Sequence, residues 1–361
     1  MDQEINAMGM LDLMVRPGFC VQNNTIIKVN QAAQSHMIAT GMDVRDYLHT
    51  GSEEYANFSG GCLYLTLDIL GALWGASVTR MDDFHVFILD QEDDQAELQA
   101  MALAARELRE PLTSVMTTAD RLFPMIALEE DPALQEQVAR LNRGLFQMLR
   151  VISNMSDANR YSSASGGRME TLDICGLFEE IFSKAQDLVS HTGIQLTFRM
   201  PKEPVYAQVD PERLERAVLN IVSNAVKFTP GGGTISAVIT RRSSMLYLTV
   251  QDTGEGIPGN LKGSIHSRYL RKPAIEDSRF GIGLGMVLIR STAAQHGGTV
   301  LIDQPEGTGT RITMTISIRP TSSGTLRSPT LKVDYAGERD HGLIELSASL
   351  PAQLYEVKKV N

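Results

Sequence analysis

Two long runs of apolar residues at alternating steps of four and three constrain this chain more than any other feature. The first comprises Met101, Ala105, Leu108, Leu112, Val115, Ala119, Leu122 and Ile126, and the second Leu134, Val138, Leu141, Leu145, Met148, Ile152 and Met155. This rhythm is typical of a coiled-coil seam and predicts two helices within residues 92–160. An acidic turn ending in Asp131-Pro132 separates the runs, and Pro favours a helix start. The pattern therefore predicts an antiparallel helical hairpin.

One hairpin buries too little apolar surface to be stable alone. Two hairpins in a homodimer would make a four-helix bundle. An intramolecular bundle is the alternative, but it would need two further helices, which the sequence lacks. We therefore expect a homodimer.

A block of short β-like runs precedes the hairpin, over residues 9–90. The runs are Gly18–Val21, Thr25–Val29, Gly61–Leu67, Leu73–Thr79 and Phe84–Leu89, with one helical stretch between them. They predict a small α+β domain. Residues 19–33 combine an Asn-Asn hairpin turn with Asn30 at a helix start, and this segment resembles the opening of a PAS sensor domain, although unrelated folds use the same devices. No haem-like, flavin-like or metal-ligand cluster identifies a signal, and we expect His85 to be structural.

Composition excludes several classes of function. The net charge of −10 is spread along 361 residues without a basic stripe, so we expect no nucleic-acid partner. Cys20, Cys62 and Cys175 lie far apart and predict neither a disulfide framework nor a zinc site, which favours a cytoplasmic protein. The start of the sequence does not resemble a secretion signal. The stretch Cys62–Val78 is about long enough to span a membrane, but Asp68 in its middle and its alternating leucines favour a pair of strands.

Small polar residues over Tyr161–Gly167 predict a flexible linker before a mixed block at residues 170–318. Strands are expected there at Thr234–Ile239, Met245–Gln251 and Thr310–Ile318. Residues 320–361 form a tail of unknown role. The apolar piece Gly342–Leu350 is compatible with docking on the body or binding a partner, but an extra strand or a disordered tail is favoured.

Three constellations in the mixed block carry chemistry. Asn220, Asn224 and Lys227 share one face of a predicted helix, where an amide oxygen suits Mg²⁺ and an ammonium neutralises phosphate. Asp252 ends a strand before a turn containing Gly254 and Gly256, and its carboxylate is suited to accept a hydrogen bond from the exocyclic amine of adenine. Gly281, Gly283 and Gly285 open an apolar helix, and bare backbone N–H groups at such a helix start bind phosphate oxygens. Each pattern alone is common.

In this order the three constellations resemble the asparagine box and the two glycine boxes of bacterial sensor histidine kinases, over about 150 residues. The resemblance implies a multidomain α+β protein: a PAS-like sensor, a dimerisation hairpin and a Bergerat-type α/β sandwich that binds ATP and Mg²⁺. It implies that Asn224 holds Mg²⁺, that Asn220 and Lys227 contact phosphates, and that Asp252 reads adenine. It also places the Gly281–Gly285 loop and Thr310 against the nucleotide.

Two departures from the family pattern lie within this block. Where gyrase-like relatives carry a Glu that activates water, this chain has Asn220, which disfavours rapid ATP hydrolysis. The lid at residues 259–279 also lacks the aromatic pattern of the family, offering only Ile265, Tyr269 and basic residues.

A third departure lies in the first hairpin helix. Residues 105–114 resemble the family's phosphoacceptor box, with Arg106 at the position of the acceptor His, followed by Glu107 and Pro111. A guanidinium stays protonated and offers no lone pair, so Arg106 cannot accept a phosphoryl group. The seven histidines, at positions 36, 49, 85, 191, 266, 296 and 341, all lie outside the hairpin. Glu110 replaces the small polar residue that the family's phosphatase activity uses.

Two hypotheses follow. In the first, the chain is a pseudokinase, a dimeric, nucleotide-responsive regulator or scaffold that binds a response regulator or a partner kinase. In the second, its ATP domain phosphorylates a partner protein in trans through positioning and Mg²⁺. A decayed copy is the remaining alternative.

Overall fold

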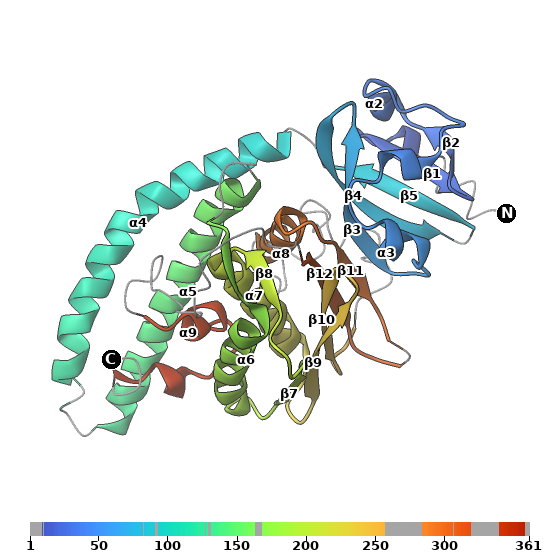
Figure 1. Cartoon of the computed structure of the whole chain (residues 1–361). Coiled ribbons are helices and arrows are strands. Elements are labelled where there is room, and N and C mark those ends of the chain that lie inside the picture. The colour runs from blue at the N-terminus through green and yellow to red at the C-terminus, as the bar shows by residue number, and fades with distance from the viewer. Residues whose placement is uncertain are drawn as a thin grey trace.

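The computed structural model describes residue 9 and residues 11–81, 83–90, 93–126, 128, 131–162, 168–256, 284–305, 307–318 and 339–357. Figure 1 shows an N-terminal α+β unit, two long helices and a larger unit of sheet and helices.

The N-terminal unit contains all five strands that the sequence predicts. They are β1 Gly18–Gln22, β2 Thr25–Val29, β3 Cys62–Ile69, β4 Ala72–Met81 and β5 Phe84–Leu89, with α2 Gln31–Gln34, η1 Val44–Tyr47 and α3 Ser52–Ala56 between β2 and β3. Asn30 caps α2, as expected: its Oδ1 accepts hydrogen bonds from Ala33 N at 2.9 Å and from Gly18 N at 3.1 Å.

The stretch tested as a membrane span is the β3–β4 pair, as the alternating leucines indicated. Within the described residues, no helix is both long and apolar enough to cross a membrane. His85 lies on β5, 3.0 Å from the hydroxyl of Tyr55, and burial lowers its pKa.

Helices α4 Asp93–Ile126 and α5 Pro132–Ser162 pack along each other, and α5 begins at the predicted Pro132. Their shared core contains Ala105, Leu112, Met116, Ala119, Leu145 and Ile152. Five further members of the predicted seams are about half exposed or more: Leu108, Val115 and Leu122 on α4, and Leu141 and Met148 on α5. Packing of the two helices against each other therefore leaves part of their apolar surface exposed.

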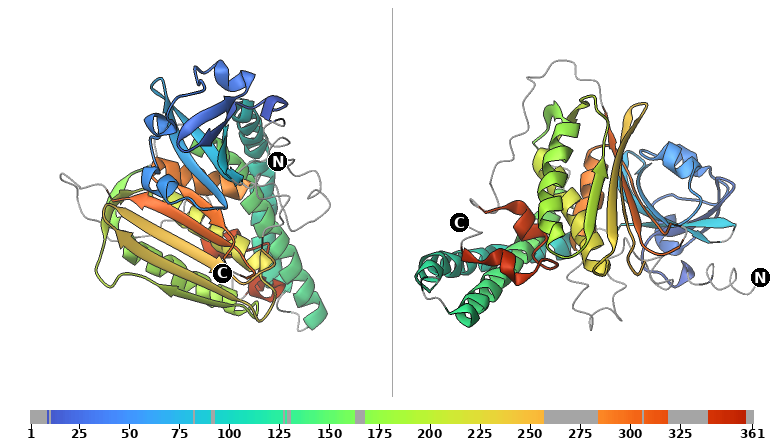
Figure 2. Two further views of the ribbon diagram at one scale, coloured as in Figure 1. Left: turned by 90° about the vertical axis from the view of Figure 1, so that its right-hand side faces the viewer. Right: turned by 90° about the horizontal axis from the view of Figure 1, so that it is seen from below.

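The larger unit places helices on one face of a sheet (Figure 2). Its strands are β6 Glu170–Asp173, β7 Gln195–Arg199, β8 Tyr206–Val209, β9 Thr234–Arg242, β10 Met245–Asp252, β11 Val300–Asp303 and β12 Arg311–Ser317. Its helices are α6 Ile174–Ser190, α7 Pro211–Phe228 and α8 Leu284–Gln295. The predicted strands at β9, β10 and β12 are confirmed. Phe178, Phe182, Leu214, Leu246 and Ile316 belong to the core between the helices and the sheet.

The two units share one ten-stranded sheet, ordered β2-β1-β5-β4-β3-β11-β12-β10-β9-β7. They meet where β3 pairs antiparallel with β11, with Cys62 opposite Ile302 and Tyr64 opposite Val300. Arg290 of α8 reinforces this junction, because it pairs with Asp90 at 3.4 Å and lies over the ring of Tyr64. The sequence did not predict this junction.

The C-terminal segment, residues 339–357, corrects the expectation of an extra strand or a disordered tail. It forms α9 His341–Glu345 and η4 Ala352–Tyr355, and its apolar residues Leu343, Ile344, Leu346, Leu350 and Tyr355 join the core of the larger unit. Figure 2 shows it between α5 and the sheet-bearing unit. Burial of these apolar side chains explains why the segment docks.

Candidate functional site

Helix α7 carries the first constellation. Asp210 caps it by accepting a hydrogen bond from Arg213 N at 3.1 Å, and Pro211 occupies its first turn. Asn220 is buried, with 1% of its surface exposed, whereas Asn224 and Lys227 are partly exposed. Lys227 lies in the last turn, where a cation interacts favourably with the helix dipole. Asn224 and Lys227 are therefore the members of this set that solvent reaches.

The second constellation is a closed loop around Asp252. The carboxylate Oδ1 of Asp252 accepts hydrogen bonds from Gly254 N at 2.8 Å and Thr310 N at 3.1 Å, and Asp252 N donates to Thr310 O at 3.0 Å. Burial raises the pKa of Asp252, and the two backbone hydrogen bonds oppose this shift. Among the described residues, the hydrogen bonds donated to this carboxylate end on Oδ1.

Two glycines let the backbone close in around Asp252. A Cβ at Gly254 would collide with the carbonyl oxygen of Phe228, the last residue of α7. A Cβ at Gly309 would collide with the carbonyl oxygen of Asp252, and Gly309 also has a φ of 100°. The second constellation therefore lies directly against the end of the first. Gly256, the other predicted glycine of this loop, has a φ of 75°.

The third constellation is described only from α8 onward. Gly281 and Gly283 lie outside the described residues, as does the lid at residues 259–279. Gly285, in the first turn of α8, faces α7: a Cβ there would lie 2.8 Å from Oδ1 of Asn220. The structure thus brings the Asp252 loop and Gly285, the described member of the third constellation, against α7.

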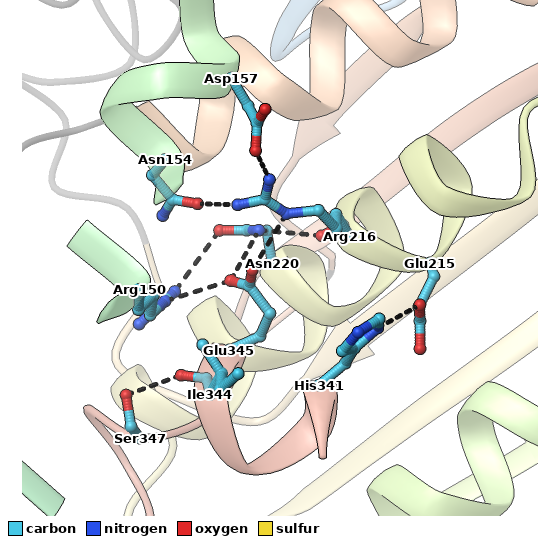
Figure 3. A network of polar contacts seen from close by, with 10 residues as sticks. All are labelled: Arg150, Asn154, Asp157, Glu215, Arg216, Asn220, His341, Ile344, Glu345 and Ser347. Carbon is cyan, nitrogen blue, oxygen red and sulfur yellow. Dashed lines mark hydrogen bonds and ion pairs between the residues drawn. The ribbon is translucent and has the colours of Figure 1, made fainter. Parts of the chain in front are cut away.

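Asn220 has partners that the sequence did not predict (Figure 3). Its Nδ2 donates to Arg216 O at 2.8 Å and to Oε2 of Glu345 at 3.2 Å, while its Oδ1 accepts from Nη2 of Arg150 at 3.4 Å. Both ends of the amide are therefore engaged by protein groups.

A buried polar network surrounds this amide. Arg216, which has no exposed side-chain surface, donates to Oε1 of Glu345 at 3.2 Å and to Oδ1 of Asn154 at 2.6 Å, and pairs with Asp157. Arg150 also pairs with Glu345, at 3.3 Å. Figure 3 shows side chains from α5, α7 and α9 converging here. No motif marks these residues, because the contacts join positions up to 195 residues apart.

Arg106 and Glu107 are exposed on α4, whose main packing partner is α5. The structure does not bring them into the group formed by α7, α8 and the Asp252 loop.

Residues 209–320 match the family model described as histidine kinase-, DNA gyrase B- and HSP90-like ATPase. This region of the chain is therefore similar to the ATPase domains of that family. The matched region contains Asn220, Asn224, Asp252 and the start of α8, so the family match and the described site residues fall on the same part of the chain.

The chain is also similar to sensor histidine kinases. It is 26% identical over 238 residues to hybrid signal transduction histidine kinase D of Dictyostelium discoideum, covering 64% of this chain and 15% of that protein. It is 26% identical over 234 residues to sensor histidine kinase WalK of Bacillus subtilis, covering 63% of this chain and 38% of that protein. A crystal structure of full-length ShkA in complex with AMPPNP is 22% identical, with a TM-score of 0.49, and the match covers 62% of this chain and 47% of that one. The chain thus spans less than half the length of each of these relatives.

Proposed function

We propose that this chain is a nucleotide-responsive regulator or scaffold in two-component signalling, which binds ATP with Mg²⁺ and does not phosphorylate itself at the usual position. The observation that carries the proposal is the contrast within one chain. Two backbone donors hold the carboxylate of Asp252 in an arrangement that suits base recognition, whereas the acceptor position on α4 holds the exposed Arg106.

Asp252 supplies the recognition of adenine. Two backbone donors fix its Oδ1 and so orient the carboxylate. Its Oδ2 would then accept a hydrogen bond from the exocyclic amine of adenine. Guanine presents an acceptor at that position and would leave Oδ2 unpaired, so the loop selects adenine nucleotides.

Asn224 and Lys227 are suited to the phosphate end. Mg²⁺ keeps most of its waters and takes phosphate oxygens as ligands, so a single amide oxygen from Asn224 is a sufficient protein contribution. Lys227 and Asn220 would contact the phosphates, and bound Mg²⁺ would neutralise their charge. None of these groups is a base able to activate water, which supports slow hydrolysis.

The remaining blocks take the roles that their sequence suggests. Residues 9–90 would be the PAS-like sensor, residues 92–160 the dimerisation hairpin and residues 170–318 the ATP-binding unit. The β3–β11 junction supplies a direct contact between the PAS-like sensor and the ATP-binding unit. A response regulator or a partner kinase would be the target.

Homodimerisation is supported by the apolar stripe left on the hairpin. Replacing Leu122 by Glu places a charge in this stripe, so we expect dimer to be lost in favour of monomer, measured by sedimentation velocity. Leu70→Glu is the matched control, because Leu70 is 79% exposed in the turn between β3 and β4. A dimer that persists in Leu122→Glu would exclude this face as the interface.

Calorimetric titration of the full chain with Mg²⁺ and a non-hydrolysable ATP analogue tests the proposed site. Asn224→Ala should weaken binding by about 10- to 150-fold, the range for losing a hydrogen-bond-strength contact to a charged group. Without Mg²⁺, the variant and the parent chain should differ little. Asn57→Ala, at the exposed end of α3, is the control. Binding that is saturable and unaffected by Asn224→Ala would contradict the assignment.

A further inference from the structure

We propose that the C-terminal segment is an autoinhibitory lock on the nucleotide site, in which the carboxylate of Glu345 takes the place of a nucleotide phosphate. Docking of the segment and binding of the Mg²⁺–nucleotide then compete. This inference rests on the proposed nucleotide site and adds its regulation.

The competition starts at Asn220. Its Nδ2 points at Glu345, 3.2 Å away, and its Oδ1 lies 3.4 Å from Nη2 of Arg150. A phosphate that used this amide would have to displace Glu345. If Glu345 stayed in place, the phosphate would lie next to its fully buried carboxylate. Two negative charges that are close together and shielded from water repel each other strongly.

Arg150 and Arg216 explain how a nucleotide phosphate and the carboxylate of Glu345 can occupy the same place. Arg150 and Arg216 both bind the carboxylate of Glu345, at 3.3 Å and 3.2 Å. A guanidinium recognises carboxylate and phosphate oxygens with the same donor geometry. Arg150 is the reachable member of the pair, because its side chain is 16% exposed while that of Arg216 is fully buried. A phosphate arriving at Asn220 therefore finds a cation that already holds an anion.

The segment also ties the ATPase domain to the hairpin. On α5, Asn142 donates to Tyr355 O at 2.9 Å, and Arg143 donates to Ser347 O at 3.0 Å and to Ala348 O at 3.1 Å. On α7, Glu215 contacts Nδ1 of His341 at 2.7 Å. These contacts hold α5 and α7 in one relative position. Release of the segment would free the nucleotide site and loosen this domain orientation, which the contacts of Arg216 with Asn154 and Asp157 also support.

The test is the affinity of the full chain for Mg²⁺ with a non-hydrolysable ATP analogue, compared with that of Glu345→Gln. The substitution keeps the shape and removes the charge. We expect affinity to rise roughly 5- to 150-fold, the usual range of coupling between two sites. Glu136→Gln is the matched control, since Glu136 makes an exposed pair with Arg140 on α5.

Two further measurements keep the proposal testable if Glu345→Gln fails to fold. Arg143→Ala removes hydrogen bonds to the segment without touching Asn220, and it should raise affinity by a smaller factor. Because coupling is reciprocal, saturating nucleotide should speed hydrogen exchange of the amides at residues 341–355 in the parent chain.

The outcomes separate the two proposals. Equal or weaker binding in both variants than in the parent chain would overturn the lock and leave the nucleotide site standing. No binding in the parent chain or in either variant would overturn the nucleotide site and the lock with it.

Discussion

Replacing Asp252 by Asn should weaken ATP binding by about 10- to 150-fold, the range for a hydrogen bond to a charged group. Asn keeps one oxygen to accept from Gly254 N and Thr310 N, so the loop retains its closure. Its amide nitrogen then replaces Oδ2 and presents a donor to the adenine amine, which is also a donor. Calorimetric titration with the non-hydrolysable analogue measures the loss.

The matched control is Asp187→Asn, on the exposed side of α6 in the same unit. It makes the same charge change and should leave affinity unchanged. The ratio of the affinities for the adenine and guanine analogues is a second measurement, because Asp252→Asn should reduce this ratio. An unaltered affinity and preference would mean that Asp252 does not read the base.

Replacing Arg216 by Ala should lower the free energy of unfolding by about 3–5 kcal/mol, the cost of leaving a buried charge without its partner. Arg216 is the cation that Glu345 and Asp157 share, and all three side chains are buried. Urea denaturation followed by far-ultraviolet circular dichroism gives the change, and the variants are compared at equal protein concentration because the proposed dimerisation would contribute to stability.

Arg140→Ala is the comparison, because Arg140 pairs with Glu136 in solvent and such pairs contribute about 0–1 kcal/mol. The double variant Arg216→Ala, Glu345→Gln should recover part of the lost free energy of unfolding, because the unpaired buried carboxylate of Glu345 is removed. A loss below about 1 kcal/mol for Arg216→Ala would contradict a structural role for this network.

Local patterns predicted what depends on neighbours along the chain. The alternating residues of β3 and β4, the cap at Asn30 and the start of α5 at Pro132 follow from periodicity and from capping preferences, and all are confirmed. The order of the three constellations indicated a candidate site, because their placement on α7, β10 and α8 needs only the strand and helix assignments.

Long-range contacts escaped prediction for a physical reason. Nothing around Glu345 signals that it meets Arg150 and Asn220, because one apolar stretch of nine residues fits a strand, a helix or a docking segment equally well. The β3–β11 pairing is similar, since backbone hydrogen bonds at a sheet edge leave no side-chain signature. As a result, the sequence predicted Asn220 as a phosphate contact but did not predict its hydrogen bond to Glu345 of the C-terminal segment.

The most direct test incubates the full chain with Mg²⁺ and γ-labelled ATP, quenches in alkali to preserve phosphohistidine, and measures nucleotide binding on the same sample. We predict saturable binding without alkali-stable label, because the acceptor position is Arg106 and the hairpin contains no histidine. Label that survives alkali and is lost in acid would contradict this account and show that another histidine accepts the phosphoryl group.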